Sequence, residues 1–375
     1  MIHIVINAHL LSAQTGYRSA GIHGYIYNTL RCLPYVTPDW HYTVLVGEGN
    51  PAEHPRMEIR HSRFSTRHPV QRIVWEQLVQ PGVIRHLKPD VYHAAAFVSP
   101  VMMRVPSVVT VYDLSFIRYP QALSASRRLY LQTFTRLSCQ RAAQVIAISE
   151  STARDIIDLL GVHPEKVTVA VPGVSEDFYP REPSEIQAFR EKNQLPDRFI
   201  LHLGTLEPRK NLPMLLRAYA TLPESQREEV HLILAGGKGW EYADIFDTVK
   251  SCNLERVVHF PGYVAKDELP LWYNAAEMLV YPSVFEGWGL PVVEAMACGC
   301  PTLVSDVSSL PEAAGNTGLR LPPDDETAWV EGLRHAITDT TWRAYSRQAG
   351  IERAKQFTWQ ATAAATGRAY EKALR

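Results

Sequence analysis

The chain reads Val-Tyr-Pro-Ser-Val-Phe-Glu-Gly-Trp-Gly-Leu-Pro-Val-Val-Glu-Ala-Met-Ala-Cys-Gly-Cys-Pro at residues 280–301. The apolar residues at and just before its start predict a buried strand that ends at Pro282. Pro291 stands where a helix would begin and Gly299 where it would end, which predicts a short helix over residues 290–298. The stretch therefore predicts a strand, a glycine-containing loop and a helix.

The loop carries two glycines, Gly287 and Gly289, whose backbone can approach a ligand closely. The loop amides, through Leu290, open the predicted helix, and a helix N-terminus is a site for an anion. Glu286 lies in the loop, and Glu294 lies about one turn into the helix. Two carboxylates beside an anion site suggest a ligand that also carries hydroxyl groups, as a phosphorylated sugar does. The alternative is that Glu294 favours the helix dipole and Glu286 is a solvated loop charge.

The two glutamates, with Gly-Trp-Gly-Leu-Pro between them and Ala-Met-Ala-Cys-Gly-Cys-Pro after them, resemble the signature of retaining GT-B glycosyltransferases of family four. The resemblance extends over essentially the whole chain, and its most specific motifs lie in the second half. It implies an α/β fold of two Rossmann-like parallel-sheet domains facing across a cleft, with a C-terminal helix that crosses back to the first domain. It also implies that the second domain binds a nucleotide-sugar and the first an acceptor.

The chain length and a cluster of Pro and Gly residues also predict two domains. A chain of 375 residues, 46% of them hydrophobic, can bury two sizeable cores. Pro and Gly cluster in residues 172–183, where the apolar periodicity stops, and this indicates a linker. We expect residues 1–172 and the C-terminal helix 359–375 to form the first domain, and residues 173–358 to form the second.

In the first half, strands alternate with helical stretches, which predicts a parallel sheet covered on both faces. Ligands gather at the carboxyl ends of such strands. This rule places His93, Tyr112 and Asp113 at the expected rim of the sheet. Asp113 is a candidate catalytic residue that would bind a sugar hydroxyl, with a simple turn cap as the alternative. Residues 51–69, rich in Arg, His and Pro, are predicted to form a loop.

Residues 109–116 resemble a family motif in which a histidine usually stands where this chain has Tyr112. Tyrosine can form a hydrogen bond but cannot carry a proton near neutral pH. Two interpretations of His93 are open: it substitutes for that histidine, or it ends a strand and satisfies backbone groups.

The loop after the first strand contains Gly16, Gly21 and Gly24. Their spacing differs from the dinucleotide fingerprint, so a dinucleotide-binding fold is the less favoured interpretation. Residues 19–22 instead resemble the glycine loop that approaches the donor pyrophosphate in family-four enzymes. The resemblance thereby makes Gly21 a candidate donor-binding residue.

The second half begins with a strand through Gly204, which is followed by Glu-Pro-Arg-Lys-Asn at residues 207–211. Asn211 is the expected N-cap, so Arg209 and Lys210 stand at the positive end of a helix, where cations are unfavourable by some tenths of a kcal/mol each. A bound anion would remove this conflict. The alternative is that the two charges are solvated in a loop.

The Pro-Arg-Lys-Asn run also resembles the diphosphate-binding motif of the family. Arg209 and Lys210 would then stabilise the departing diphosphate, Glu294 would accept hydrogen bonds from the ribose, and Glu286 would hold hydroxyls of the transferred sugar. The resemblance adds Gly204 and Val264 as donor-binding residues, with Val264 in a segment whose backbone meets the nucleotide base.

The resemblance implies no cofactor and no metal, because the two cationic side chains take that role and no Asp-x-Asp run is present. Similarity is greatest to bacterial transferases of polysaccharide and O-antigen assembly that use GDP-mannose or GDP-rhamnose. A GDP-sugar donor and a saccharide or lipid-linked acceptor are therefore expected, and a UDP-sugar is open. The competing classes are a GT-B epimerase, a pyridoxal-phosphate phosphorylase and a non-catalytic nucleotide-sugar-binding protein.

Charge is unevenly distributed. Residues 1–172 hold 17 Lys+Arg and 11 Asp+Glu (17 − 11 = +6), and the remainder holds 21 and 28 (21 − 28 = −7). The basic half indicates an anionic surface or substrate. A basic stretch at residues 124–143 suggests peripheral contact with an anionic membrane, with an ordinary surface helix as the alternative. No nucleic-acid partner is expected.

Five cysteines, an odd number without Cys-x-x-Cys spacing, predict free thiols and a cytoplasmic location. Residues 1–7 also lack the features of a signal peptide.

Overall fold

The computed structural model describes residues 2–11, 21–47, 49–62 and 69–375. The chain divides into two compact units, of which the first comprises Met1–Gly173 with Thr358–Arg375 and the second comprises Val174–Phe357. Both boundaries lie one residue from the expected ones. Each unit contains a parallel β-sheet and its own buried apolar core.

The first unit is built on a seven-stranded sheet of order β3-β2-β1-β4-β5-β6-β7, in which every pairing is parallel. Its strands are β1 (His3–Asn7), β2 (His41–Val46), β3 (Met57–His61), β4 (Val91–Ala94), β5 (Ser107–Val111), β6 (Gln144–Ala147) and β7 (Val167–Val169). The chain order reverses between β1 and β4, which is the topological switch point of a doubly wound sheet.

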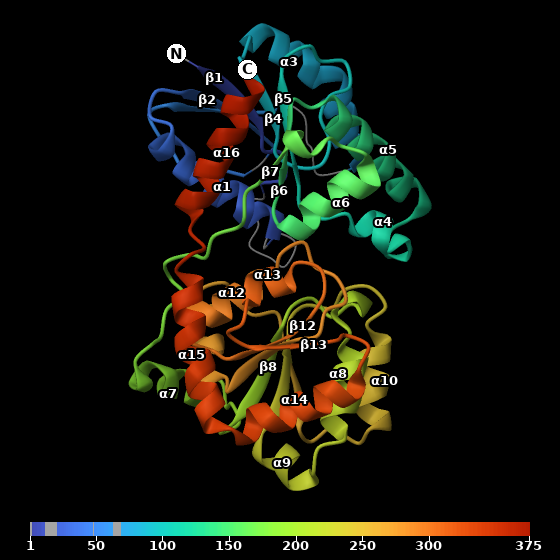
Figure 1. Cartoon of the computed structure of the whole chain (residues 1–375), viewed down its shortest axis with the longest axis vertical. Helices are drawn as coiled ribbons and strands as arrows, with labels where there is room; N and C mark the ends of the chain where they lie inside the picture. Colours follow the sequence, from blue (N-terminus) through green and yellow to red (C-terminus); the bar gives the residue numbers. More distant parts are fainter. Residues whose placement is uncertain (1, 12–20, 48, 63–68) are drawn as a thin grey trace. The chain divides into compact units, whose positions relative to one another are not determined.

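Helices cover both faces of this sheet, as expected for parallel strands joined by crossovers. They are α1 (Gly21–Val36), α2 (Pro69–Val74), the π-helical turn η2 (Trp75–Val79), α3 (Gln80–Leu87), α4 (Ser115–Arg118), the 3₁₀ turn η3 (Pro120–Ala122), α5 (Ala125–Arg141), α6 (Glu150–Leu160), the 3₁₀ turn η4 (Pro164–Lys166) and α16 (Trp359–Ala373). Figure 1 shows the C-terminal helix α16 lying along α1. The predicted return of the last helix to the first domain is confirmed, because residues 358–375 pack within the first unit.

One prediction for this unit is wrong. The segment expected to be a loop, residues 51–69, contains the strand β3, which pairs with β2 at the edge of the sheet. Only Met57 of β3 is buried, and the strand carries Glu58, Arg60 and His61. An edge strand of this kind has little apolar periodicity, so its sequence resembles a loop.

The second unit repeats the same architecture with six parallel strands in the order β10-β9-β8-β11-β12-β13. The strands are β8 (Phe199–Leu203), β9 (His231–Ala235), β10 (Val258–Gly262), β11 (Met278–Tyr281), β12 (Thr302–Ser305) and β13 (Leu319–Leu321). Its switch point lies between β8 and β11, which pair directly. This is the strand order of the Rossmann fold.

The helical segments of this unit are α7 (Pro183–Lys192), the 3₁₀ turn η5 (Pro208–Lys210), α8 (Leu212–Ala220), α9 (Glu224–Glu229), α10 (Ala243–Ser251), α11 (Leu269–Ala275), α12 (Leu290–Ala297), α13 (Leu310–Ala314), α14 (Glu326–Thr338) and α15 (Thr340–Ala354). Figure 1 shows α8, α10 and α14 around the strands of the second unit. The central strands β8 and β11 are almost wholly buried, so both faces of the sheet contribute to the core.

The predicted helix at residues 290–298 is present as α12. It ends one residue early because the chain turns at Gly299, whose φ is 71°. The Cys300 amide donates to the Ala295 carbonyl (2.8 Å) and the Gly299 amide to the Met296 carbonyl (2.9 Å). This pair of bonds satisfies the last carbonyls of the helix and fixes its end.

All five cysteines are free, and four of them are buried. In the ranges that the structure describes, no helix is long and apolar enough to cross a membrane.

Candidate functional site

The candidate site lies at the carboxyl ends of β8 and β11, the two strands that flank the switch point of the second sheet. The turn η5 follows β8, and residues 282–289 follow β11. The two loops meet, because the Val284 amide donates to the Arg209 carbonyl (3.0 Å). Ligands of doubly wound sheets bind at this edge.

The loops bring Arg209, Lys210 and Glu286 into direct contact. Lys210 Nζ lies 2.6 Å from Glu286 Oε1, and Arg209 Nη1 lies 3.0 Å from Glu286 Oε2. Lys210 Nζ also donates to the Tyr281 hydroxyl (2.7 Å). Lys210 is only 5% exposed and Glu286 only 9%. These contacts exclude the alternative that Lys210 and Glu286 are solvated loop charges.

The pKa values follow from these contacts. Burial alone would raise the pKa of Glu286, but the positive charges of Arg209 and Lys210 outweigh it and lower that pKa to about 2. Burial alone would lower the pKa of Lys210, and the charge of Glu286 raises it instead. Both groups are therefore ionised at neutral pH.

Arg209 and Lys210 do not need a bound anion to balance their charge. Arg209 also forms an ion pair with Glu207 (2.8 Å), so two carboxylates already face the two cations. Asn211 is the N-cap residue of α8, as expected, but its side chain does not cap the helix: the residue has a left-handed φ of 54°, and its side chain donates to the Pro323 carbonyl (2.7 Å). The carboxylates balance the cations and hold them in fixed positions.

The glycine loop leads into α12 with a backbone that only glycine adopts readily. Gly289 has a φ of 124°, and a Cβ atom there would lie 2.9 Å from Leu310 Cδ2. The loop is held by Ser309, whose hydroxyl lies within hydrogen-bonding distance of the carbonyls of Trp288 (2.6 Å) and Glu286 (2.9 Å) and can donate to either. Gly289 is the N-cap and has no side chain with which to cap the helix. Pro291 has no amide hydrogen and the Val292 amide donates to the Gly289 carbonyl (3.0 Å), so in the first turn of α12 it is the Leu290 amide that can serve a ligand.

Substitution of Gly289 by alanine should destabilise the protein by about 1–3 kcal/mol, because the new Cβ meets Leu310 in a sparsely populated backbone conformation. Gly24→Ala is the matched control. Gly24 lies inside α1 with no atom within 4 Å of a built Cβ, so alanine there should stabilise by about 0.4–1 kcal/mol. Urea unfolding measures both, and an unchanged midpoint for Gly289→Ala would contradict the conformation described.

Glu294 lies one turn into α12, as predicted, and is partly buried. The Tyr273 hydroxyl donates to Glu294 Oε2 (2.9 Å). Burial raises the pKa of Glu294 to about 7. The two glutamates of the motif therefore differ: Glu286 is held ionised by cations, whereas Glu294 titrates near neutral pH.

The other predicted residues of this unit lie at the same edge of the sheet. Gly204 directly follows β8, and a Cβ atom there would lie 3.4 Å from Lys210 Cε, so Gly204 is a neighbour of the cationic group. Gly287 is buried in the loop, and Leu290 begins α12. Val264 is buried and follows β10, which β9 separates from β8.

The predictions for the first unit are only partly met. Tyr112 is buried, and its hydroxyl donates to the Ala95 carbonyl (2.8 Å). Asp113 is half-buried and its Oδ1 accepts from the Ser115 amide (2.8 Å), the arrangement given as the turn-cap alternative. A catalytic role for Asp113 stays a prediction. Gly21 is the first residue of α1 and is exposed, while Gly16 lies outside the described residues.

His93 lies one residue before the end of β4, near the carboxyl edge of the sheet as expected, but its side chain is buried. Its two ring nitrogens lie 2.7 Å from the Tyr370 hydroxyl of α16 and 2.8 Å from Thr110 Oγ1. Burial lowers the pKa of His93 to about 3, so the ring is neutral. His93 joins α16 to the sheet through two side-chain contacts rather than through backbone groups.

Three residues of the second unit were missed by the sequence analysis: Glu207, Tyr281 and His202. Glu207 pairs with Arg209, and Tyr281 accepts from Lys210. His202 stacks on Tyr281 with ring centroids 5.6 Å apart, and burial with the charge of Lys210 lowers its pKa to about 3. The sequence feature that the three residues share is their position, at the ends of β8 and β11 or just after them.

The basic stretch of the first unit forms α5, but most of its arginines bind backbone groups. Arg128, Arg136 and Arg141 donate to the carbonyls of Pro120, Leu159 and Val101, respectively. The buried residues of α5 are Thr135, Ser138 and Cys139 rather than an apolar stripe. These contacts favour the alternative of an ordinary surface helix.

Across the described part of the chain, no group of three or more His, Cys, Asp or Glu side chains is placed to hold a metal ion.

Two family models match the chain. Glycosyltransferase Family 4 matches residues 21–178, and Glycosyl transferases group 1 matches residues 184–357. The two matches follow the division into two units.

Among known proteins, the chain is 34% identical to O-antigen chain mannosyltransferase B of Escherichia coli over 293 residues, which covers 78% of this chain and 77% of that protein. It is 34% identical over 230 residues to the serotype-specific mannosyltransferase WbdA of Escherichia coli, covering 60% of this chain and 28% of WbdA. Less than a third of WbdA is therefore matched.

Solved structures share the fold at lower identity. Sucrose-phosphate synthase of Thermosynechococcus elongatus superposes with a TM-score of 0.80 at 21% identity, covering 99% of this chain and 98% of that one. HepE of Anabaena, solved with UDP and glucose, gives a TM-score of 0.74 at 20% identity, covering 98% and 99%. The sequence relatives, the two family models and the shared fold lead to one conclusion: this chain is a glycosyltransferase of the GT-B fold, with a family 4 first half and a group 1 second half.

Proposed function

We propose that this glycosyltransferase moves a hexose, mannose or rhamnose, from a GDP-sugar to a saccharide or lipid-linked saccharide acceptor in cell-surface polysaccharide synthesis. The observation that carries the proposal is the buried contact of Arg209 and Lys210 with Glu286 at the switch point, next to the open start of α12. The names of the O-antigen mannosyltransferases support the choice of sugar.

The chemistry explains the arrangement. Departure of a nucleoside diphosphate develops negative charge, which Arg209, Lys210 and the amides from Gly287 to Leu290 would stabilise. Because Glu207 and Glu286 hold the two cations in place before the donor binds, little reorganisation is needed during the reaction. The side-chain cations supply the positive charge that a metal ion supplies in other transferases, so the proposed reaction is metal-independent.

We propose that the reaction retains the configuration of the sugar, with the departing diphosphate taking the proton from the acceptor on the same face. Glu286 would hold hydroxyls of the transferred sugar through acceptor positions that its bonds to the two cations leave available. Proton NMR of the anomeric signal in the first product tests this stereochemistry, and an inverted product would refute it.

Glu294 is proposed to bind the ribose hydroxyls. Glu294→Ala should weaken donor binding by about 1.5–3 kcal/mol, the range for a hydrogen bond to a charged group, which is roughly a 10- to 100-fold rise in Kd. Donor affinity should also rise with pH through about 7 in the wild type, because the carboxyl ionises there and gains acceptor capacity.

Titration calorimetry at pH 6, 7 and 8 measures both effects. Glu294→Gln should show a donor Kd that does not vary across this range, and Glu331→Ala, which removes an exposed carboxylate of α14, should match the wild type. A donor Kd unchanged in Glu294→Ala would exclude the ribose role.

A screen of GDP- and UDP-sugars, with and without acceptor, tests the function itself. Transfer from GDP-mannose or GDP-rhamnose to a mannoside is the expected result. Release of nucleotide with no glycoside formed would indicate an epimerase, and donor binding without turnover would indicate a non-catalytic binding protein. A UDP-sugar as the preferred donor would refute the choice of base.

We further propose a cytoplasmic location with peripheral contact at the inner face of the membrane. The excess of basic residues in the first half supports this contact.

A further inference from the structure

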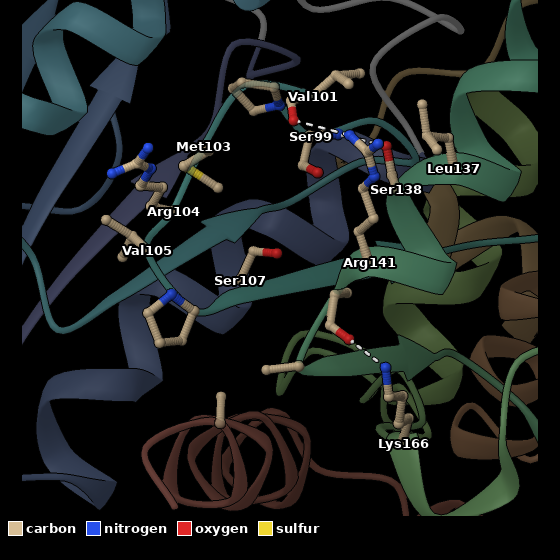
Figure 2. Close-up of a pocket in the computed structure, with 15 residues that line it drawn as sticks. Ser99, Val101, Met103, Arg104, Val105, Ser107, Leu137, Ser138, Arg141 and Lys166 are labelled. Carbon is tan, nitrogen blue, oxygen red and sulfur yellow. Dashed lines mark hydrogen bonds between the residues drawn. The ribbon is translucent and has the colours of Figure 1, made fainter.

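A pocket of about 350 Å³ lies in the first unit at the edge of the sheet opposite to the carboxyl ends of the strands (Figure 2). It is formed by residues 99–101 and 103–106, the first residue of β5, the end of α5 with the two residues after it, Lys166 and the end of α16. Ligands of doubly wound sheets bind at the carboxyl ends. The pocket is therefore separate from the acceptor and donor positions that the fold leads us to expect.

The lining is cationic. Arg104, Arg141 and Lys166 line the pocket, and no Asp or Glu is among its described lining residues. Figure 2 shows Arg104 on one side of the pocket, with its guanidinium group directed outward, and Arg141 and Lys166 on the other side. Three cationic side chains thus belong to the lining of one small pocket, and no acidic side chain does among its described lining residues.

Part of this charge has a structural use. Lys166 Nζ donates to the carbonyls of Gln140 (3.3 Å) and Ala142 (3.1 Å), so it caps the C-terminal end of α5. The negative end of a helix is equivalent to roughly half an elementary charge. Arg141 uses one of its five donors on the Val101 carbonyl (3.0 Å). The pocket retains net positive charge after these contacts.

Hydroxyl groups complete the lining. Ser99, Ser107 and Ser138 line the pocket, and the Ser99 amide donates to Ser138 Oγ (3.0 Å), which orients that oxygen. Guanidinium, ammonium and hydroxyl donors together are the groups that bind phosphate oxygens. We propose that this pocket binds a phosphate group, a function separate from the transfer reaction.

The phosphate can come from a lipid headgroup or from a soluble phosphorylated molecule. Met102, next to the lining residues, is 85% exposed, and Arg104 is also exposed. A solvent-facing apolar side chain beside cations is typical of a surface that meets an anionic membrane.

The test uses the full chain and Arg104→Glu. Arg104 is exposed, so its substitution leaves the core intact. We expect wild-type protein to sediment with phosphatidylglycerol vesicles and not with phosphatidylcholine vesicles at low salt, and Arg104→Glu to bind the former at least tenfold more weakly. In a second arm, inorganic phosphate should raise the melting temperature of the wild type more than chloride does at equal ionic strength, and this difference should shrink in Arg104→Glu.

Arg31→Glu is the matched control, because it makes the same charge change at an exposed position of α1 that does not line the pocket. Both variants retain any other phosphate-binding sites, so the comparison with Arg31→Glu also controls for phosphate bound there. If Arg104→Glu loses vesicle binding but keeps the effect of inorganic phosphate, the phosphate belongs to a lipid. If it loses the effect of inorganic phosphate but keeps vesicle binding, the phosphate belongs to a soluble molecule. Equal behaviour of the two variants in both arms, or no binding by the wild type, overturns the proposal. Donor binding should be unchanged in Arg104→Glu, so failure here is distinct from failure of the transferase function.

Discussion

Lys210→Met is expected to lower kcat by roughly 10²–10³-fold, the effect typical of removing one group that stabilises developing negative charge. Lys210 is buried, and its ammonium group is held 2.6 Å from Glu286 and 2.7 Å from the Tyr281 hydroxyl. Donor KM should change much less than kcat, because the interaction strengthens as the diphosphate departs. Steady-state kinetics with the best donor of the screen measures both constants.

The same substitution also leaves Glu286 with fewer partners, so lost stability has to be separated from lost catalysis. Lys210→Met is therefore made both in the wild type and in a Glu286→Gln background, where the carboxylate that contacts Lys210 is absent. In that background the substitution should destabilise the fold less and still lower kcat. The exposed Lys250→Ala of α10 serves as the charge control. If Lys210→Met leaves kcat unchanged in the Glu286→Gln background, Lys210 has only a structural role.

Glu286→Gln is expected to lower the free energy of unfolding by about 3–5 kcal/mol, the range for removing one partner of a buried ion pair. The carboxylate contacts both Lys210 and Arg209, and its removal leaves Lys210, which is 5% exposed, without its acidic partner. Chemical unfolding at pH 7 measures this loss. Glu331→Gln, an exposed site on α14, should change stability by less than about 0.5 kcal/mol.

The pH dependence of this stabilisation has a definite sign. The folded-state pKa of Glu286 is lowered from its ordinary value of 4.5 to about 2, so the unfolded state binds the proton more readily. The contribution of Glu286 is therefore complete above pH 4.5 and is lost as the pH falls toward 2. Glu286→Gln should show a weaker loss of stability across this range than the wild type. If the wild type and Glu286→Gln lose stability equally as the pH falls, the result would contradict the buried ion pair.

The sequence allowed the strand-loop-helix unit around Glu286 and Glu294 to be predicted because its local signals agree. An apolar strand, Pro291 at the start of a helix and Gly299 after its end each indicate the same boundaries, and the structure has α12 at Leu290–Ala297. The edge strand β3 was missed because its charged residues contain no such periodicity.

The partners of the charged side chains were harder to predict, because they depend on which loops the sheet brings together. Arg209 and Glu286 are 77 residues apart in the chain, and they meet because β8 pairs with β11. Sequence spacing alone placed the two cations at the start of a helix without acidic partners and left a solvated Glu286 as an alternative. For the same reason His93 was expected at a rim, although α16, which begins more than 250 residues later, supplies Tyr370 to bind it.

The central claim is that the nucleoside diphosphate of the donor binds in the second unit, next to Arg209, Lys210 and the start of α12. A crystal structure of the protein with its donor or with GDP tests this most directly. We predict diphosphate oxygens within hydrogen-bonding distance of Lys210 Nζ and of the amides that open α12, with the ribose hydroxyls on Glu294. A nucleotide bound elsewhere, with the contacts of Lys210 and Glu286 undisturbed, would contradict the account.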